Sequence, residues 1–345
     1  MNSANGHFLQ HLPIRTSRLL LALGLLLFAA GFRFSDGSVL MAIANNLSIE
    51  NPGFNELIQY NLDSPLKVLL LKLLPGDIIS IGLVFGLLAL SPVCGLLLSA
   101  SAIGYLSLIA VFLTPALKIA VQNIGLGDGL VISLIVVACA SRKPQVIGAC
   151  FFLIGLWHPQ QSFFIGLSYI AAQYCLLHRW SRHEYLAVLG SLGLAAVVFF
   201  LYKLLLGFDY HDRLDYLRTH LPQFIQRNLL YAPVAFAPFC GWLLLAPITI
   251  RGRGLLMLAW LLILAAAALA TTDVTRVFTL ISLPIVLIGA QNRRNPAPSA
   301  MKVLILCVLV QLIPAYSWSG LDYFMWPELY KDLCKWKHWC WPASA

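Results

Sequence analysis

Long runs of hydrophobic residues alternate with short polar stretches along almost the whole chain. A helix needs about 20 apolar residues to cross the hydrocarbon core of a bilayer, with about 17–25 as the usual range. By this criterion the pattern predicts eleven transmembrane helices, over residues 17–34, 77–92, 93–114, 126–141, 144–158, 161–178, 184–206, 230–250, 254–271, 275–291 and 301–318. Several are short, and only Ser91-Pro92-Val93 separates the second from the third, so one pair could instead form a re-entrant element.

The polar stretches between these segments predict helices that lie at the membrane surface. Residues 38–46 have helical spacing. Residues 61–75 form either an amphipathic interfacial helix, in which Lys67 and Lys72 would extend toward the headgroups, or only the entry to the second span. In the segment 207–229, apolar residues also recur at helical spacing. The first predicted span is read as a retained anchor rather than a signal peptide, because a long polar stretch precedes it and no clean cleavage site follows.

Composition supports a membrane protein and excludes most other classes. Of 345 residues, 60% are hydrophobic and 11% are charged, whereas soluble domains have about 45–50% apolar and about 25% charged residues. Basic residues punctuate the apolar runs instead of forming a solvated patch, so the net charge of +9 does not indicate a nucleic-acid binder. We therefore expect residues 1–345 to form a single all-α polytopic domain with about eleven spans.

The distribution of charge predicts the orientation of the helices. Cytoplasmic loops of membrane proteins are enriched in Lys and Arg. With a cytoplasmic N-terminus, eleven spans place every short basic loop inside, and the longer loops 35–76, 115–126 and 207–229 and the tail 320–345 outside. The basic residues of the predicted cytoplasmic side are Arg15, Arg18, Arg142, Lys143, Arg179, Arg182, Arg251, Arg253, Arg293, Arg294 and Lys302. Thirteen of the 14 acidic residues fall outside or at the outer edge, and only Glu184 falls inside.

Candidate functional residues gather on this outer side. Asp36 follows the first span, where it is either a helix N-cap or a carboxylate facing a cavity. Lys118 precedes a glycine-rich turn, and Asp128 enters an apolar span, where an ionisable residue is a functional candidate. His158 occupies a tight turn, in which a structural role and a hydrogen bond to a phosphate or sugar hydroxyl are both open.

Arginines on the outer side run against the usual orientation rule. His211, Arg213 and Arg218 belong to the charged segment 207–229, which is either a solvated surface or a phosphate-binding element. Asp273 and Arg276, three residues apart at the outer edge, either form a structural ion pair or hold an anionic headgroup.

The eight cysteines form no zinc pattern. Cys334 and Cys340 lie in the aromatic outer tail and are candidates for a disulfide, although their spacing alone does not establish one. The other six lie in or beside apolar runs and are read as small core residues: Cys94, Cys139, Cys150, Cys175, Cys240 and Cys307.

Together these features resemble the GT-C superfamily of polytopic glycosyltransferases, which use polyprenyl-phosphate-linked sugars. A carboxylate in the first outer loop is the usual catalytic base of that family, and Asp36 is the matching position. Asp63-Ser64-Pro65-Leu66 looks like the family's entrance to the second span, and the segment 273–278 looks like late motifs of bacterial surface-polysaccharide proteins. Asp36 is followed by Gly37 rather than by the second acid that is usual there.

The resemblance implies a reaction at the periplasmic face of a bacterial inner membrane. A polyprenyl (di)phosphate sugar would enter from the bilayer, and Arg276, Lys118 or an arginine of segment 207–229 would bind its phosphate. Asp36 would deprotonate the hydroxyl of a glycan or lipid acceptor. We expect no cofactor, because no His/Asp cluster has the spacing of metal ligands, although a divalent metal between Asp36 and Asp128 is conceivable.

Two other functions remain open. An O-antigen or exopolysaccharide polymerase would use similar lipid-linked substrates, with segment 207–229 as its catalytic loop. A flippase or other secondary transporter belongs to a different class, in which repeats, broken helices and charges at the membrane midplane are common. The sequence shows no evident repeat, and its charges lie at the predicted membrane edges.

Overall fold

The computed structural model describes residues 34, 37–45, 61–103, 111–122, 124–179, 181–206, 213–239, 252–291, 309–310, 313, 315–317 and 320–322. These residues are mostly helical. The helices are α2 (Gly37–Ala44), α4 (Pro65–Leu73), α5 (Ile78–Ile103), α7 (Ala116–Gln122), η2 (Ile124–Leu126), α8 (Asp128–Ala140), α9 (Pro144–Trp157), α10 (Pro159–Cys175), α11 (Arg182–Leu206), α12 (Arg213–Leu230), α13 (Ala232–Phe236), η3 (Ala237–Phe239), α15 (Arg253–Leu269) and α16 (Val274–Gln291). A short antiparallel hairpin pairs β1 (Ala315–Ser317) with β2 (Gly320–Asp322).

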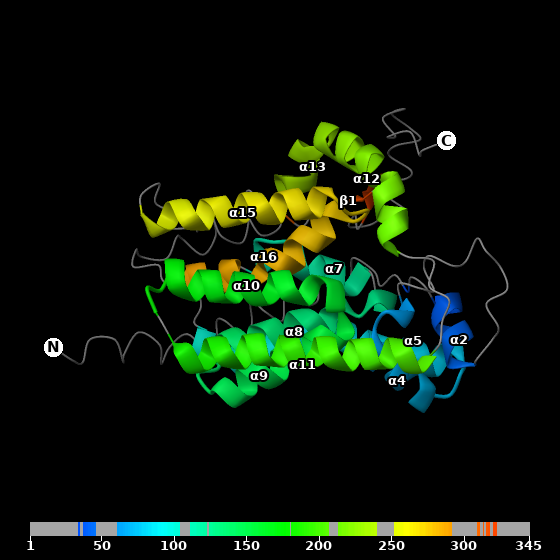
Figure 1. Cartoon of the computed structure of the whole chain (residues 1–345). Coiled ribbons are helices and arrows are strands. Elements are labelled where there is room, and N and C mark those ends of the chain that lie inside the picture. The colour runs from blue at the N-terminus through cyan, green and yellow to red at the C-terminus, as the bar shows by residue number, and fades with distance from the viewer. Residues whose placement is uncertain are drawn as a thin grey trace.

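The long helices form a bundle in which α8, α9, α10, α11 and α15 run roughly along one direction (Figure 1). The bundle is built around α16, whose residues from Val274 to Ala290 are all buried. α16 packs against α10, α15, α8 and α7, whereas α5 packs mainly against α8, and α11 against α9. The outer face of α11 exposes large apolar side chains, among them Leu194, Phe200 and Leu204. Such a surface is unfavourable in water and suits contact with lipid chains.

Helix length and composition support a helical membrane protein. Within the described ranges, three helical segments are long and apolar enough to cross a bilayer: Ile78–Leu96, Arg182–Leu205 and Val274–Gln291. Three shorter apolar helices accompany them, at Asp128–Ala140, Pro144–Trp157 and Arg253–Leu269. The described part of the chain is therefore helical apart from the small hairpin, as expected for a helical membrane protein, while the number of spans stays a prediction.

The predicted break between the second and third spans is wrong. α5 continues through Pro92 and ends at Ile103. A proline inside a helix leaves the carbonyl four residues earlier without its amide donor. In this case Ser91 Oγ donates a hydrogen bond to that carbonyl, Leu88 O, at 2.6 Å, and also lies 2.7 Å from Ser133 Oγ of α8. A side-chain hydroxyl thus replaces the missing backbone donor and keeps the helix continuous.

Other sequence expectations also need correction. The predicted span 230–250 does not begin as one helix, because α12 ends at Leu230 and only the short α13 and η3 follow within the described residues. β1 occupies 315–317, inside the predicted last span. Cys94 is exposed rather than a core residue, whereas Cys139, Cys150 and Cys175 are buried as expected. α2 and α12 confirm the predicted helices near 38–46 and within 207–229.

Most acidic side chains of the described bundle lie at one of its ends, together with several lysines and arginines, as the charge pattern predicts. At one end, which we call the acidic end, Asp63, Asp128 and Asp273 lie near the termini of α4, α8 and α16. At the opposite, basic end, Arg253 Nη1 lies 2.8 Å from His178 Nδ1, and Arg179 pairs with Glu184. Because α8 begins and α9 ends at the acidic end, the turn 141–143 with Arg142 and Lys143 belongs to the basic end.

Close packing of α5 against α8 yields a first prediction, for Gly129→Ala. A Cβ atom at Gly129 would lie 2.3 Å from Leu88 O and 2.7 Å from Ala89 Cα, so the two backbones would have to separate. We expect the substitution to cost about 1–3 kcal/mol of stability. The matched control is Gly82→Ala on α5, where an added Cβ meets nothing within 4 Å; it should be neutral or stabilising by up to about 1 kcal/mol. Thermal unfolding in detergent would measure both, and equal melting temperatures would contradict the prediction.

Candidate functional site

Asp128 lies buried at the first residue of α8, at the acidic end of the bundle. The chain reaches it through α7, η2 and Gly127, whose φ of 69° is in the left-handed region that favours glycine. A Cβ at Gly127 would also lie 2.4 Å from Trp157 Cζ2, so the close approach of Trp157 requires glycine there. The start of a helix favours negative charge, which suits the carboxylate at this position.

Arg276 binds this carboxylate with two hydrogen bonds. Its Nε lies 2.5 Å from Asp128 Oδ2 and its Nη2 lies 2.9 Å from Asp128 Oδ1, an arrangement in which the planar guanidinium matches both oxygens. A third donor, Nη1, lies 3.3 Å from Asp273 Oδ2. The local pair expected from the i, i+3 spacing therefore forms, but the closer partner of Arg276 lies 148 residues away in sequence.

His158 completes a buried triad with these two residues. Its Nε2 lies 2.9 Å from Asp128 Oδ1. Because Asp128 is paired with a guanidinium and can only accept, Nε2 carries the proton and donates it. Burial is the main cause that lowers the pKa of His158, to about 4, and the nearby Arg276 acts in the same direction, against the opposing effect of Asp128. His158 is therefore neutral at pH 7.

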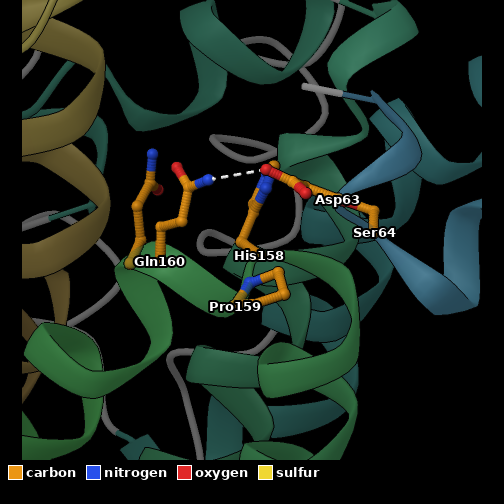
Figure 2. A pocket seen from close by; sticks show the side chains of 6 residues that line it. Asp63, Ser64, His158, Pro159 and Gln160 are labelled. Carbon is orange, nitrogen blue, oxygen red and sulfur yellow. Dashed lines mark hydrogen bonds between the residues drawn. The ribbon is translucent and has the colours of Figure 1, made fainter. Parts of the chain in front are cut away.

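A second polar cluster lies beside the triad. Asp63 precedes α4, and its Oδ2 accepts a hydrogen bond from Gln160 Nε2 at 3.1 Å, as Figure 2 shows. Its Oδ1 lies 3.3 Å from Lys203 Nζ, near the end of α11. Ser64 Oγ donates to Trp157 O, and Tyr202 Oη donates to Leu62 O at 3.0 Å. These bonds tie the segment before α4 to α9, α10 and α11.

Lys67 does not extend toward the headgroups as the amphipathic pattern predicts. It is buried, its Nζ donates to Asn61 Oδ1 at 2.9 Å, and it lies over the Trp157 ring, 5.7 Å from the centroid. The exposed residues of α4 are the apolar Leu69 and Leu73 together with Lys72, which is exposed as the pattern predicts. One lysine of α4 therefore faces the bundle, whereas the outward side combines two leucines with Lys72, as suits a helix at the boundary between lipid and headgroups.

The structure brings together four of the residues proposed from sequence: Asp128, His158, Asp273 and Arg276. Lys118 is also buried, and its Nζ donates to Ile313 O. Other proposed residues cannot be placed at the site. The backbones of Arg213 and Arg218 belong to α12, but their side chains lie outside the described part of the structure, as do the whole residues Asp36, His211, Cys334 and Cys340.

Sequence reasoning missed the most accessible cation of the cluster, Lys203. Its side chain is 30% exposed, whereas that of Arg276 is 2% exposed and occupied by two carboxylates. A signal was available, because Lys203 is a cation at the predicted outer end of a span and thus opposes the orientation rule. Gln160 carried no such signal, since its role depends on the tertiary position of Asp63.

No protein-family model, curated protein or solved structure matches this chain. Among the residues that the structure describes, no group of three or more His, Cys, Asp and Glu side chains is placed to hold a metal ion. The interpretation of the site therefore depends on its own geometry and chemistry.

The neutral state of His158 predicts a loss of stability in mild acid. The unfolded chain binds a proton at His158 near pH 6.5, but the folded chain does so only near pH 4, so between these values the unfolded state binds more protons. The contribution of neutral His158 to the free energy of unfolding is complete above pH 6.5. It decreases as the pH is lowered, by about 2 kcal/mol at pH 5. As the pH is lowered from 7.5 to 4.5, the melting temperature of the wild type should decrease more than that of His158→Gln. The two values should therefore converge, or the wild type should become the less stable protein. Parallel pH profiles of the two proteins would contradict this account.

Proposed function

We propose that the protein is a membrane glycosyltransferase that moves a sugar from a polyprenyl (di)phosphate carrier to a hydroxyl acceptor at the acidic end of the bundle. The supporting observation is the segregation of polar chemistry. Asp63, Asp128, His158, Lys203 and Arg276 gather at one end, next to outward-facing apolar surfaces of α4 and α11. A polar site at the edge of a lipid-facing bundle suits a substrate with a polar head and a long lipid tail.

The same segregation disfavours the transporter alternative. Between their terminal turns, helices α5, α8, α9, α10, α11, α15 and α16 carry no Asp, Glu, Lys or Arg. Transporters commonly place ionisable residues and broken helices near the middle of the bilayer, along the path of the substrate. A chemical site confined to one end instead fits a reaction that takes place at one membrane face.

The proposed reaction assigns a role to three groups. The carboxylate of Asp36 removes the proton of the acceptor hydroxyl while its oxygen attacks the anomeric carbon of the sugar. The bond from that carbon to the phosphate oxygen breaks, and the polyprenyl phosphate or diphosphate leaves with the electron pair. Lys203, the accessible cation of the cluster, stabilises the negative charge of the leaving group. The buried pair of Asp128 and Arg276 holds α8 and α16 together beneath the site and is a positioning element. The active face would be periplasmic, in a bacterial inner membrane.

A transfer assay tests this proposal. Purified protein in nanodiscs would receive undecaprenyl phosphate carrying radiolabelled glucose, galactose or mannose, with membrane glycolipids and glycans of the source cell as acceptors. Labelled product that requires the protein, with release of undecaprenyl phosphate, would support a transferase. Passage of the intact labelled lipid across liposome membranes without a new glycosidic bond would overturn the proposal in favour of transport. Labelled ladders made from lipid-linked repeat units would instead identify a polymerase.

A further inference from the structure

A small depression lies at the acidic end, directly above the buried triad. Its lining residues are Asp63, Ser64, His158, Pro159, Gln160 and Gln161 (Figure 2). They come from the segment before α4 and from the first turn of α10. The depression is shallow and open to the outside, so a ligand would lie on its lining atoms rather than inside a closed cavity.

The position of these lining groups is fixed by bonds to three different helices. Gln160 Nε2 holds Asp63 Oδ2, Lys203 of α11 holds Asp63 Oδ1, and Ser64 is anchored on the carbonyl of Trp157 in α9. Below them, His158 is held by Asp128. A ligand would therefore meet a preorganised set of polar atoms, which lowers the entropic cost of binding.

One of the lining residues has an unfilled hydrogen-bonding position. Gln161 Oε1 is buried and accepts no hydrogen bond. A buried acceptor without a donor is unfavourable, because it has lost its water without gaining a partner. A ligand that brings a hydroxyl donor to this depression would remove that penalty.

The charges and donors around the depression select the class of ligand. The residues that line the depression include one carboxylate and no lysine or arginine, so the depression itself suits a neutral group better than an anionic one. Carboxylate and amide side chains present both acceptors and donors, which match a group that both donates and accepts. Neutral hydroxyls have this property, and adjacent hydroxyls on one ring would satisfy several lining atoms at once.

We propose that this depression binds the hydroxyl groups of the sugar that is attached to the polyprenyl carrier, with Gln161 Oε1 accepting from one hydroxyl and Asp63 from its neighbour. This inference rests on the proposed function and adds the place at which the sugar is recognised. Lys203, whose Nζ lies 3.3 Å from Asp63 Oδ1, would then pair with the phosphate that links the sugar to its lipid, while Asp63 accepts from the sugar hydroxyl.

The test compares two lipids and two variants. Purified protein in nanodiscs would be titrated with undecaprenyl phosphate, and separately with undecaprenyl phosphate carrying glucose, galactose or mannose, and binding read by native mass spectrometry. The wild type should prefer at least one sugar-bearing lipid. Gln161→Leu removes the acceptor at similar volume and should reduce that preference by about two- to ten-fold, without changing the affinity for undecaprenyl phosphate.

Gln173→Leu is the matched control. Gln173 lies on the same helix, near its other end, and also has a buried Oε1 without a partner. This variant should keep the wild-type preference, and melting temperatures would show that both variants fold. If Gln161→Leu keeps the full sugar preference, or if the wild type binds all these lipids equally well, the depression is not the sugar site and the proposed function can still stand. If the wild type binds none of the lipids, the proposed function itself fails, and the sugar site fails with it.

Discussion

Replacing Arg276 with glutamine should lower the free energy of unfolding by about 3–5 kcal/mol, the range seen when one partner of a buried ion pair is removed. Arg276 is 2% exposed and Asp128 is fully buried, so no water can replace the guanidinium. The variant would lose both hydrogen bonds of the fork and leave Asp128 with only His158 as a described partner. In the wild type these bonds join the first turn of α16 to the start of α8. Because α16 packs inside the bundle, their loss should weaken the packing of the central helix.

Unfolding in mixed micelles, followed by circular dichroism, would measure this loss. The matched control is Arg179→Gln, which breaks the pair between Arg179 and Glu184 at the basic end. The side chain of Arg179 is 39% exposed and that of Glu184 is 3% exposed. Because water reaches this pair from the Arg179 side, the loss should be smaller than for Arg276→Gln. A loss for Arg276→Gln no larger than that for Arg179→Gln would show that the buried pair does not stabilise the bundle.

A double variant distinguishes the loss of the interaction between Asp128 and Arg276 from the cost of leaving one buried charge without its partner. Asp128→Asn together with Arg276→Gln removes both charges and keeps polar groups that can bond to each other and to His158. Replacing both partners of a buried pair is often nearly neutral, whereas removing one is costly. The double variant should therefore be more stable than Arg276→Gln alone, and an additive loss would argue against direct coupling of the two side chains.

The sequence predicts those features of the site that depend on residues close together in the chain, and it fails for contacts between residues far apart in the chain. Asp128 and Arg276 are each recognisable because a charge inside an apolar run is costly and therefore conspicuous. Their pairing is not recognisable, since the spacing of Asp273 and Arg276 offers a local alternative and the real partner is 148 residues away. The gathering of most acidic groups at one end, in contrast, follows from the loop charges alone.

The wrong predictions for Pro92 and Lys67 have physical causes of the same kind. A rule for isolated proline predicts the end of a helix at Pro92, but the hydroxyl of Ser91 supplies the missing donor. A rule for isolated lysine predicts that Lys67 reaches toward the surface, but Asn61 and the Trp157 ring provide a polar place for it inside the bundle. In both cases a neighbouring side chain satisfies a group that the sequence rule treats as unsatisfied.

Asp36→Asn should reduce sugar transfer by about 10²–10⁴-fold, the usual contribution of a general base. Asp36 lies outside the described residues, and its role rests on the resemblance of the first outer loop to that of GT-C enzymes. α2 begins at Gly37, directly after it, so a helix N-cap is the competing role. Asparagine distinguishes the two roles, because it caps helices about as well as aspartate but cannot take a proton from a hydroxyl.

The assay with undecaprenyl-phosphate sugars would measure this variant beside Asp77→Asn. Asp77 caps α5 in the way that Asp36 would cap α2: its Oδ1 accepts the amide hydrogens of Ile79 at 3.0 Å and Ser80 at 2.8 Å, and these bonds lower its pKa. Asp77→Asn removes a carboxylate before another helix and retains the cap, so transfer should stay within about two-fold of wild type. If Asp36→Asn behaves like Asp77→Asn, with full transfer and unchanged melting temperature, Asp36 is a helix cap. The base must then be sought among the other carboxylates of the acidic end, where Asp63 contacts the depression and Asp128 is already committed to Arg276.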